Sequence, residues 1–254
     1  MKTITQHLFT AMLLMLPMIL VAETGYELAK AMEDKTAPAD MKSNMTMVLT
    51  NKQGKTREST IRSITADDNR KQIIWFLAPA DDKGVAFLKI EHAKKDDEMR
   101  LWLPAFKKVR RISSKKKADS FMGSDLSYED MTSRELDEYT YEILGEKVID
   151  GVDCHILEST PKAGVTLTYK RFVTYVSKAD LVSILDEAFD TRDKLLKRRV
   201  MKFRKDKGYD LPVEIFVENV QKNTNTRLIF SDQEVDTGVK EDLFQEKNLK
   251  RMPK

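Results

Sequence analysis

The chain has 254 residues, of which 44 are Lys or Arg and 41 are Asp or Glu, giving a formal net charge of +3. The two signs are interspersed along most of the sequence, so the net charge gives little information about partners. Cys154 is the single cysteine, which excludes a disulfide within the chain and leaves the fold to rest on its own core. The length suits one all-β domain or two small ones.

The first residues predict a secretory signal peptide. A short positive start at Met1 and Lys2 precedes an apolar run over residues 8–21, and Ala22 is a small residue suited to cleavage. The run has about 14 residues, whereas spanning a membrane takes about 20, so a retained anchor is the less favoured alternative. We therefore expect residues 1–22 to be removed and residues 23–254 to form a single domain in the exported compartment.

After the expected cleavage site, the sequence predicts one short amphipathic helix. Thr24 and Glu27 have the spacing of a capping box, in which each side chain accepts a backbone N–H at the helix start. Leu28 and Met32 fall on one helical face, and Pro38 ends the run.

From Met41 onward the hydrophobic period changes to two, which is typical of strands with one buried face. The connections are too short for parallel crossovers, so neighbouring strands should be antiparallel. Strands are predicted at residues 41–50, 57–65, 71–78, 85–91, 98–103, 139–149, 154–159, 170–177, 182–190, 194–204, 213–220 and 226–235, with a short helix at 241–250.

About a dozen strands cannot form a compact flat sheet without strong curling. We therefore expect a mainly β protein whose strongly curved antiparallel sheet forms an incomplete, half-open barrel. The N-terminal helix and a mid-chain segment would cap its mouth.

The most informative stretch runs from Leu103 to Asp130. A basic cluster there precedes apolar side chains that a solvated loop does not ordinarily carry. Because these apolar groups need cover, we expect the segment to act as a lid over an apolar groove, with Gly123 giving it backbone freedom. The predicted lid residues are Phe121, Met122, Gly123, Leu126 and Tyr128.

The predicted strands supply apolar side chains for the inner face of the sheet. Their periodicity fits a packed core as well as a cavity, and the lid-like segment favours a cavity. Methionines would adapt such a cavity to ligands of different shape. The predicted lipid-cavity residues are Met45, Met47, Leu49, Trp75, Leu77, Phe87, Met99, Leu101 and Leu103.

The basic cluster has more than one interpretation. In a cytosolic protein it could neutralise nucleic-acid phosphates, but export disfavours that partner. Anionic lipid headgroups or an acidic patch on a membrane protein suit it better. A solvated rim that keeps a sheet edge from pairing is an equally simple alternative. The predicted docking residues are Lys107, Lys108, Arg110 and Arg111.

Signals for catalysis are weak. After residue 22 the chain has only two histidines, and it has no nucleophile elbow, paired-cysteine metal motif, phosphate loop or dinucleotide fingerprint. The acidic group Asp119, Asp125, Glu129 and Asp130 could hold a divalent cation. Helix capping explains these residues more simply. We therefore predict no catalytic residues, no metal and no cofactor.

A specific set of residues in the same stretch carries a family resemblance, and weaker matches follow it at Gly151, Cys154, Pro161, Lys162, Gly208, Tyr209 and Pro212. The specific set is Leu103, Pro104, Arg110, Arg111, Ile112, Asp119, Ser120, Phe121, Gly123, Ser124, Asp125, Ser127, Tyr128, Glu129 and Asp130. With these residues, nearly the whole chain after residue 22 resembles the bacterial outer-membrane lipoprotein-sorting protein family, in the superfamily of LolA-like periplasmic carriers.

The resemblance implies a curved antiparallel sheet covered by helices over an apolar cavity that accepts lipid or acyl chains. It also implies a companion of large exporters in the inner membrane. We therefore expect a non-enzymatic periplasmic carrier that transfers the acyl chains of a lipid or lipoprotein by contact between inner- and outer-membrane partners. The first alternative is a non-catalytic accessory module of an inner-membrane exporter without cargo of its own. The second, ranked lower, is an enzyme that acts on lipid or glycan through Asp125 and Glu129.

Overall fold

The computed structural model describes residues 24–92, 95–165 and 168–252. The predicted signal peptide, residues 1–22, lies outside the described residues. Within these ranges, no helix is both long and apolar enough to span a membrane.

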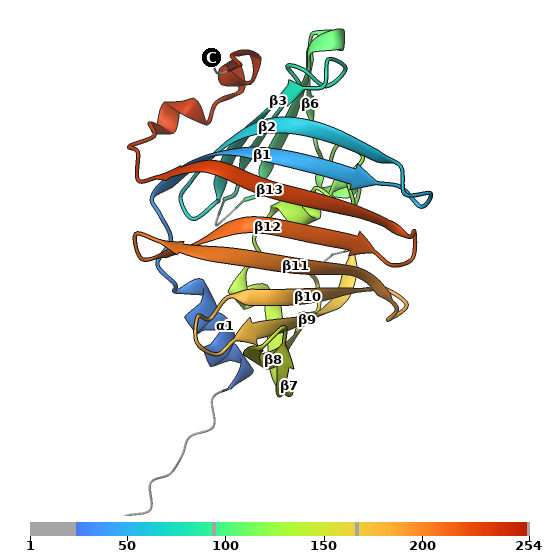
Figure 1. The fold of residues 1–254 in the computed structure, drawn as a ribbon, viewed down its shortest axis with the longest axis vertical. Helices are drawn as coiled ribbons and strands as arrows, with labels where there is room; N and C mark the ends of the chain where they lie inside the picture. The colour runs from blue at the N-terminus through green and yellow to red at the C-terminus, as the bar shows by residue number, and fades with distance from the viewer. Residues whose placement is uncertain (1–23, 93–94, 166–167, 253–254) are drawn as a thin grey trace, which may run out of the picture.

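One antiparallel sheet dominates the fold, as the sequence predicts, and Figure 1 shows its strands crossing the molecule. Its thirteen strands are arranged in the order β6-β5-β4-β3-β2-β1-β13-β12-β11-β10-β9-β8-β7, so β6 and β7 are the two free ends of an open sheet. The strands are β1 (Asp40–Thr50), β2 (Thr56–Ala66), β3 (Lys71–Ala78), β4 (Ala86–Ile90), β5 (Glu98–Leu103), β6 (Lys108–Arg111), β7 (Tyr139–Ile149), β8 (Val152–Pro161), β9 (Tyr169–Ser177), β10 (Ser183–Asp190), β11 (Leu195–Asp206), β12 (Tyr209–Asn219) and β13 (Thr224–Val235).

The order follows from simple hairpins. Consecutive strands pair with each other from β1 through β6 and from β7 through β13, and the pair β1 with β13 joins the two runs. The strand β6 was not predicted, because its residues are basic apart from Val109 and show no apolar alternation.

The N-terminal helix α1 (Gly25–Glu33) begins with the predicted capping box. The Glu27 backbone N–H donates to Thr24 Oγ1 at 3.2 Å, and the Thr24 backbone N–H donates to Glu27 Oε2 at 2.9 Å. Leu28 is fully buried against Leu157 and Val176, and α1 lies beside β7 and β8 (Figure 1). A Cβ at Gly25 would lie 2.7 Å from the carbonyl carbon of Tyr141, so only glycine permits this close approach.

The C-terminal segment lies at the other end of the sheet, drawn in red in Figure 1. The predicted helix at residues 241–250 is instead a pair of short 3₁₀ turns, Glu241–Leu243 and Glu246–Lys250. Phe244 and Leu249 pack against Ile73, Trp75 and Leu88, on the outer face of the sheet. These apolar contacts hold the segment in place and bury one of the two tryptophans.

The mid-chain segment, which we define as residues 113–138, covers the inner face of the sheet. Figure 1 shows it in green behind β12 and β13. Its short 3₁₀ turns are Ser114–Lys116, Glu129–Met131 and Leu136–Glu138, and a further turn, Pro104–Phe106, precedes β6. The inner face and the mid-chain segment together enclose the candidate site.

Candidate functional site

An aromatic cluster lies where the mid-chain segment meets the inner face. Phe121 and Tyr128 of the segment are 3% and 6% exposed, respectively, and they pack against Phe76 of β3 and Phe87 of β4. The Phe121 ring centroid is 5.2 Å from that of Phe87 and 5.8 Å from that of Tyr128. These two side chains therefore cover apolar residues of the sheet.

The segment reaches this face through a tight turn. The Phe121 backbone N–H donates to the Leu126 carbonyl at 2.7 Å, and Ser124 Oγ donates to the Phe121 carbonyl at 2.6 Å. Met122 and Gly123 both have positive φ, +50° and +78°, and nothing lies within 4 Å of a Cβ built on Gly123. Glycine relieves backbone strain at the second of these positions.

Asp125 fastens the turn to the sheet. Its backbone N–H donates to Thr226 Oγ1 at 2.8 Å, and its carboxylate accepts from the hydroxyls of Thr224 and Thr226, the latter at 2.9 Å. Both threonines belong to β13. This local group of bonds fixes the position of Leu126, which is 6% exposed against the inner face.

An apolar cavity of about 550 Å³ lies beside the aromatic cluster, beneath the mid-chain segment. Its walls come from β1, β2 and β3 on one side and from β11, β12 and β13 on the other, with Phe121, Leu126 and Met131 of the segment. Most of its apolar lining is Met41, Met45, Met47, Ile61, Ile74, Met201, Phe203, Leu211, Ile215, Leu228 and Phe230.

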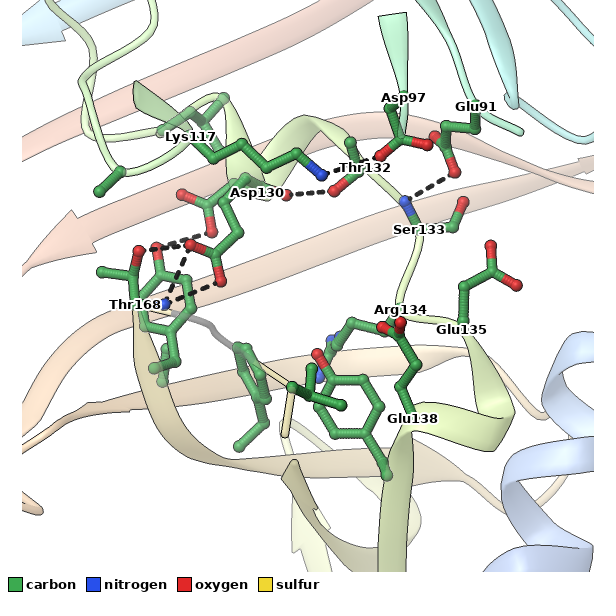
Figure 2. Close-up of a pocket in the computed structure, with 18 of the residues that line it drawn as sticks. Glu91, Asp97, Lys117, Asp130, Thr132, Ser133, Arg134, Glu135, Glu138 and Thr168 are labelled. Atoms are coloured by element: carbon green, nitrogen blue, oxygen red, sulfur yellow. Dashed lines mark hydrogen bonds and ion pairs between the residues drawn. The ribbon is translucent and has the colours of Figure 1, made fainter. Parts of the chain in front are cut away.

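A second, charged cavity of about 890 Å³ adjoins the first, and the two share Leu126, Asp130 and Arg199 in their walls. Figure 2 shows its side chains, which come from the mid-chain segment and from the sheet. Lys117 Nζ lies 2.9 Å from Asp97 Oδ2 (Figure 2). The Thr168 backbone N–H donates to the Glu129 carboxylate.

Two ion-pair groups form the common wall of the cavities. Asp130 Oδ2 lies 2.6 Å from Lys197 Nζ, and Asp130 Oδ1 accepts from the Tyr169 hydroxyl at 2.8 Å. Asp186 lies 2.7 Å from both Arg134 and Arg199. These pairs tie the mid-chain segment to β9, β10 and β11.

The electrostatics of this wall follow from burial and pairing. Burial alone would raise the pKa of Asp130, but the Lys197 ammonium holds that pKa below its ordinary value. Asp186 follows the same pattern, since Arg134 and Arg199 lower a pKa that burial would raise. Burial dominates at Glu129, whose pKa is raised in spite of its bonds to Thr168.

The predicted cavity residues divide into three groups. Met45 and Met47 line the apolar cavity. Leu49, Phe87, Met99, Leu101 and Leu103 do not line it and instead pack in the same core cluster as Phe121. Trp75 and Leu77 were assigned to the wrong face, because they pack on the outer side with the C-terminal segment, where Trp75 Nε1 donates to the Asn248 carbonyl at 3.4 Å.

Sequence reasoning missed most of the apolar wall that β11, β12 and β13 supply. The signal was present as alternation in Met201 and Phe203 and in Leu228 and Phe230, with Ile215 on the strand between them. The alternation predicted strands there, yet it could not show that these strands line the same cavity as β1, β2 and β3.

The predicted docking residues lie together at one end of the sheet. Lys108, Arg110 and Arg111 are exposed on the end strand β6, and Lys107 directly precedes it. Phe106, one residue further back, is 70% exposed. A bulky aromatic side chain in water beside four cations is an uncommon surface feature.

The acidic residues considered as metal ligands do not converge. Asp125 bonds to threonines of β13, Glu129 bonds to Thr168, and Asp130 pairs with Lys197. The Ser127 hydroxyl accepts from the Asp130 N–H at 3.2 Å, but the N-cap of the turn Glu129–Met131 is Tyr128, which makes no side-chain capping bond. Across the described ranges, no group of three or more His, Cys, Asp or Glu side chains is arranged to hold a metal ion.

Comparison with known proteins identifies the family. A family model described only as an uncharacterized protein matches residues 68–251. The structure of a DUF1329 family protein from Desulfovibrio piger is 33% identical, with a TM-score of 0.83 over 89% of this chain and 97% of that one. The chain belongs to the DUF1329 family.

Two further solved structures are similar to that of this DUF1329 family protein. A putative outer membrane lipoprotein-sorting protein domain from Vibrio parahaemolyticus is 30% identical, with a TM-score of 0.84 over 89% of this chain and 98% of that one. A LolA superfamily protein from Nitrosomonas europaea is 18% identical with a TM-score of 0.69, over 89% of this chain and 99% of that one, and so has the same fold. The resemblance seen in the sequence is thus confirmed. A search of curated proteins gave no match.

Proposed function

We propose that this protein is a periplasmic carrier that binds the acyl chains of a lipid or lipoprotein in its apolar cavity. The supporting observation is the cavity itself, whose volume of about 550 Å³ lies within the range of about 300–1,000 Å³ typical of small-molecule sites. In this proposal the sheet acts as a half-open barrel and the mid-chain segment as its lid. In this proposal the protein has no catalytic activity, and the predicted signal peptide directs its export.

Energetics favour transfer by contact. Burying a methylene is worth about 0.8 kcal/mol, so releasing a chain of about 16 carbons into water would cost on the order of 12 kcal/mol. Free release would therefore be slow. We propose that cargo passes directly from an inner-membrane partner to the carrier and then to an outer-membrane acceptor. The residues Lys107, Lys108, Arg110 and Arg111 would form the docking surface.

Co-purified lipid tests this proposal. The full-length gene would be expressed in a Gram-negative host, and the native protein extracted with organic solvent for mass spectrometry. Leu228→Trp places a bulky ring in the apolar cavity, and we expect it to reduce bound lipid several-fold. Ile229→Trp is the matched control, because Ile229 is the next residue of β13 and is 40% exposed. A lipid-free wild-type protein, or equal lipid in all three proteins, would contradict the carrier proposal.

The packed part of the inner face favours a second candidate. Phe121 and Tyr128 fill the space against β3 and β4, so this half of the interior resembles an ordinary core. An accessory module of an inner-membrane exporter, without cargo of its own, would need only such a core. The same extraction separates the candidates, because the accessory module would be purified without lipid.

A further inference from the structure

A band of polar side chains crosses the mainly apolar inner face of β1, β2 and β3. Ser43 of β1 and Ser63 of β2 are cross-strand partners, and Thr65 of β2 is partnered with Gln72 of β3. The Gln72 Nε2 group donates to Ser63 Oγ at 3.3 Å. All four residues line the apolar cavity, and we name them the polar band.

Two atoms of the polar band have no hydrogen-bond partner. Among the described residues, Ser43 Oγ and Gln72 Oε1 are buried side-chain atoms without one. Ser43 is 1% exposed and Gln72 is 9% exposed. A buried polar atom left unpaired destabilises a protein by about 1–3 kcal/mol, so each such atom needs an explanation, and a binding role is one. Both residues line the cavity, but the two unpaired atoms have almost no accessible surface, so a ligand reaches them once these side chains rotate toward the cavity.

The position of the polar band suits the polar linkage that joins the hydrocarbon chain of an amphiphile to its headgroup. Beyond it along β1, the cavity is lined by Met45 and Met47, with Ile61 and Ile74 on the neighbouring strands. In the other direction, Met41 leads to the rim formed by residues 35–38. A hydrocarbon chain would lie in the first region, and the group that joins it to the rest of the molecule would lie at the polar band.

We propose that the polar band selects acyl chains that carry an N–H or O–H donor beside the carbonyl, such as an amide-linked or a hydroxylated chain. The Gln72 oxygen can only accept, so it needs a donor from the ligand. The Ser43 hydroxyl can donate to the ligand carbonyl. A simple ester offers acceptors alone and leaves Gln72 unpaired. This inference rests on the proposed carrier function and names the class of its cargo.

A pair of matched probes tests the selection. N-palmitoylglycine and its ester analogue O-palmitoylglycolate have the same chain and carboxylate, and they differ only in N–H against O. We expect the native wild-type protein, stripped of lipid, to bind the amide about tenfold more tightly, which is the effect of one buried hydrogen bond. Comparing the affinities of palmitate and 3-hydroxypalmitate shows whether a hydroxyl group on the chain can supply the donor in place of an amide.

Variants show whether the polar band causes the selection. Gln72→Met keeps the side-chain volume. It should weaken the binding of the amide probe alone and so make the two affinities equal. Ser43→Ala should weaken the binding of both probes. It should not lower the thermal unfolding midpoint of the lipid-free protein, because the hydroxyl that it removes is unpaired. Thr46→Ala, on the outer side of β1, is the matched control and should change neither affinity.

The possible failures are distinct. If wild type binds both glycine-derived probes equally, or if Gln72→Met weakens both by the same factor, the selection is overturned and the carrier proposal stands. If wild type binds none of the four probes, the carrier proposal fails together with it.

Discussion

Asp40 is a buried carboxylate that fastens the C-terminal segment to the first strand. Its Oδ1 accepts from the Thr237 backbone N–H at 2.9 Å and from the Thr237 hydroxyl at 2.7 Å. Its Oδ2 accepts from the backbone N–H groups of Gly238 and Val239 at 2.9 and 3.1 Å. Burial alone would raise the pKa of Asp40, but these four donors lower it below its ordinary value.

This pattern predicts a pH-dependent contribution to stability. Because the pKa of Asp40 is lower in the folded than in the unfolded chain, its stabilisation is complete above the unfolded value of about 3.9 and is lost as the pH falls toward the folded value. We expect Asp40→Asn to lower the free energy of unfolding at pH 7 by about 1–3 kcal/mol, and by less at pH 3. Urea unfolding at both pH values measures this, with Asp150→Asn at an exposed turn as the control. An equal loss at both pH values would refute the assignment.

At the scale of elements, the mid-chain segment is held on the sheet by bonds that one substitution can weaken. Asp125→Ala removes the carboxylate that accepts from Thr224 and Thr226. We expect amide hydrogen exchange over residues 119–128 to rise several-fold while exchange in β13 changes little. Asp119→Ala, an exposed acid in the same segment, should leave the exchange unchanged. If Asp125→Ala leaves the exchange as in wild type, Asp125 does not hold the segment.

Element order was predictable because alternation is strong in almost every strand, and the capping box fixed the start of α1. The face of Trp75 was not predictable. Five of the eight residues of β3 are buried, and they lie on both faces of the strand because the C-terminal segment covers the outer face. Ile74 and Trp75 therefore look equivalent in sequence. A cavity and a core also share one apolar pattern. What separates Met45 from Phe87 is the position of the mid-chain segment, which depends on tertiary contacts such as those of Asp125.

At the scale of the whole molecule, the charge distribution predicts which surface would bind an anionic membrane. The net charge is only +3, so any attraction to an anionic surface must be local. The end strand β6 concentrates cations beside the exposed ring of Phe106. Cations can approach lipid phosphates while an aromatic ring enters the interface, and this combination suits an anionic bilayer.

We therefore expect the purified protein to bind vesicles containing phosphatidylglycerol at low salt, and to lose most of this binding above about 0.3 M salt, since screening shortens the range of such attraction. Replacing Lys107, Lys108, Arg110 and Arg111 by Gln should reduce the bound fraction at least tenfold in a sedimentation assay, because each cation near the surface is worth about 1 kcal/mol. The control replaces four exposed lysines elsewhere, Lys52, Lys55, Lys207 and Lys222, and so removes the same charge. Equal losses in the two variants would mean that total charge, and not the β6 surface, governs binding. Phe106→Ser separates the two parts of the surface, because it should weaken binding without changing its dependence on salt.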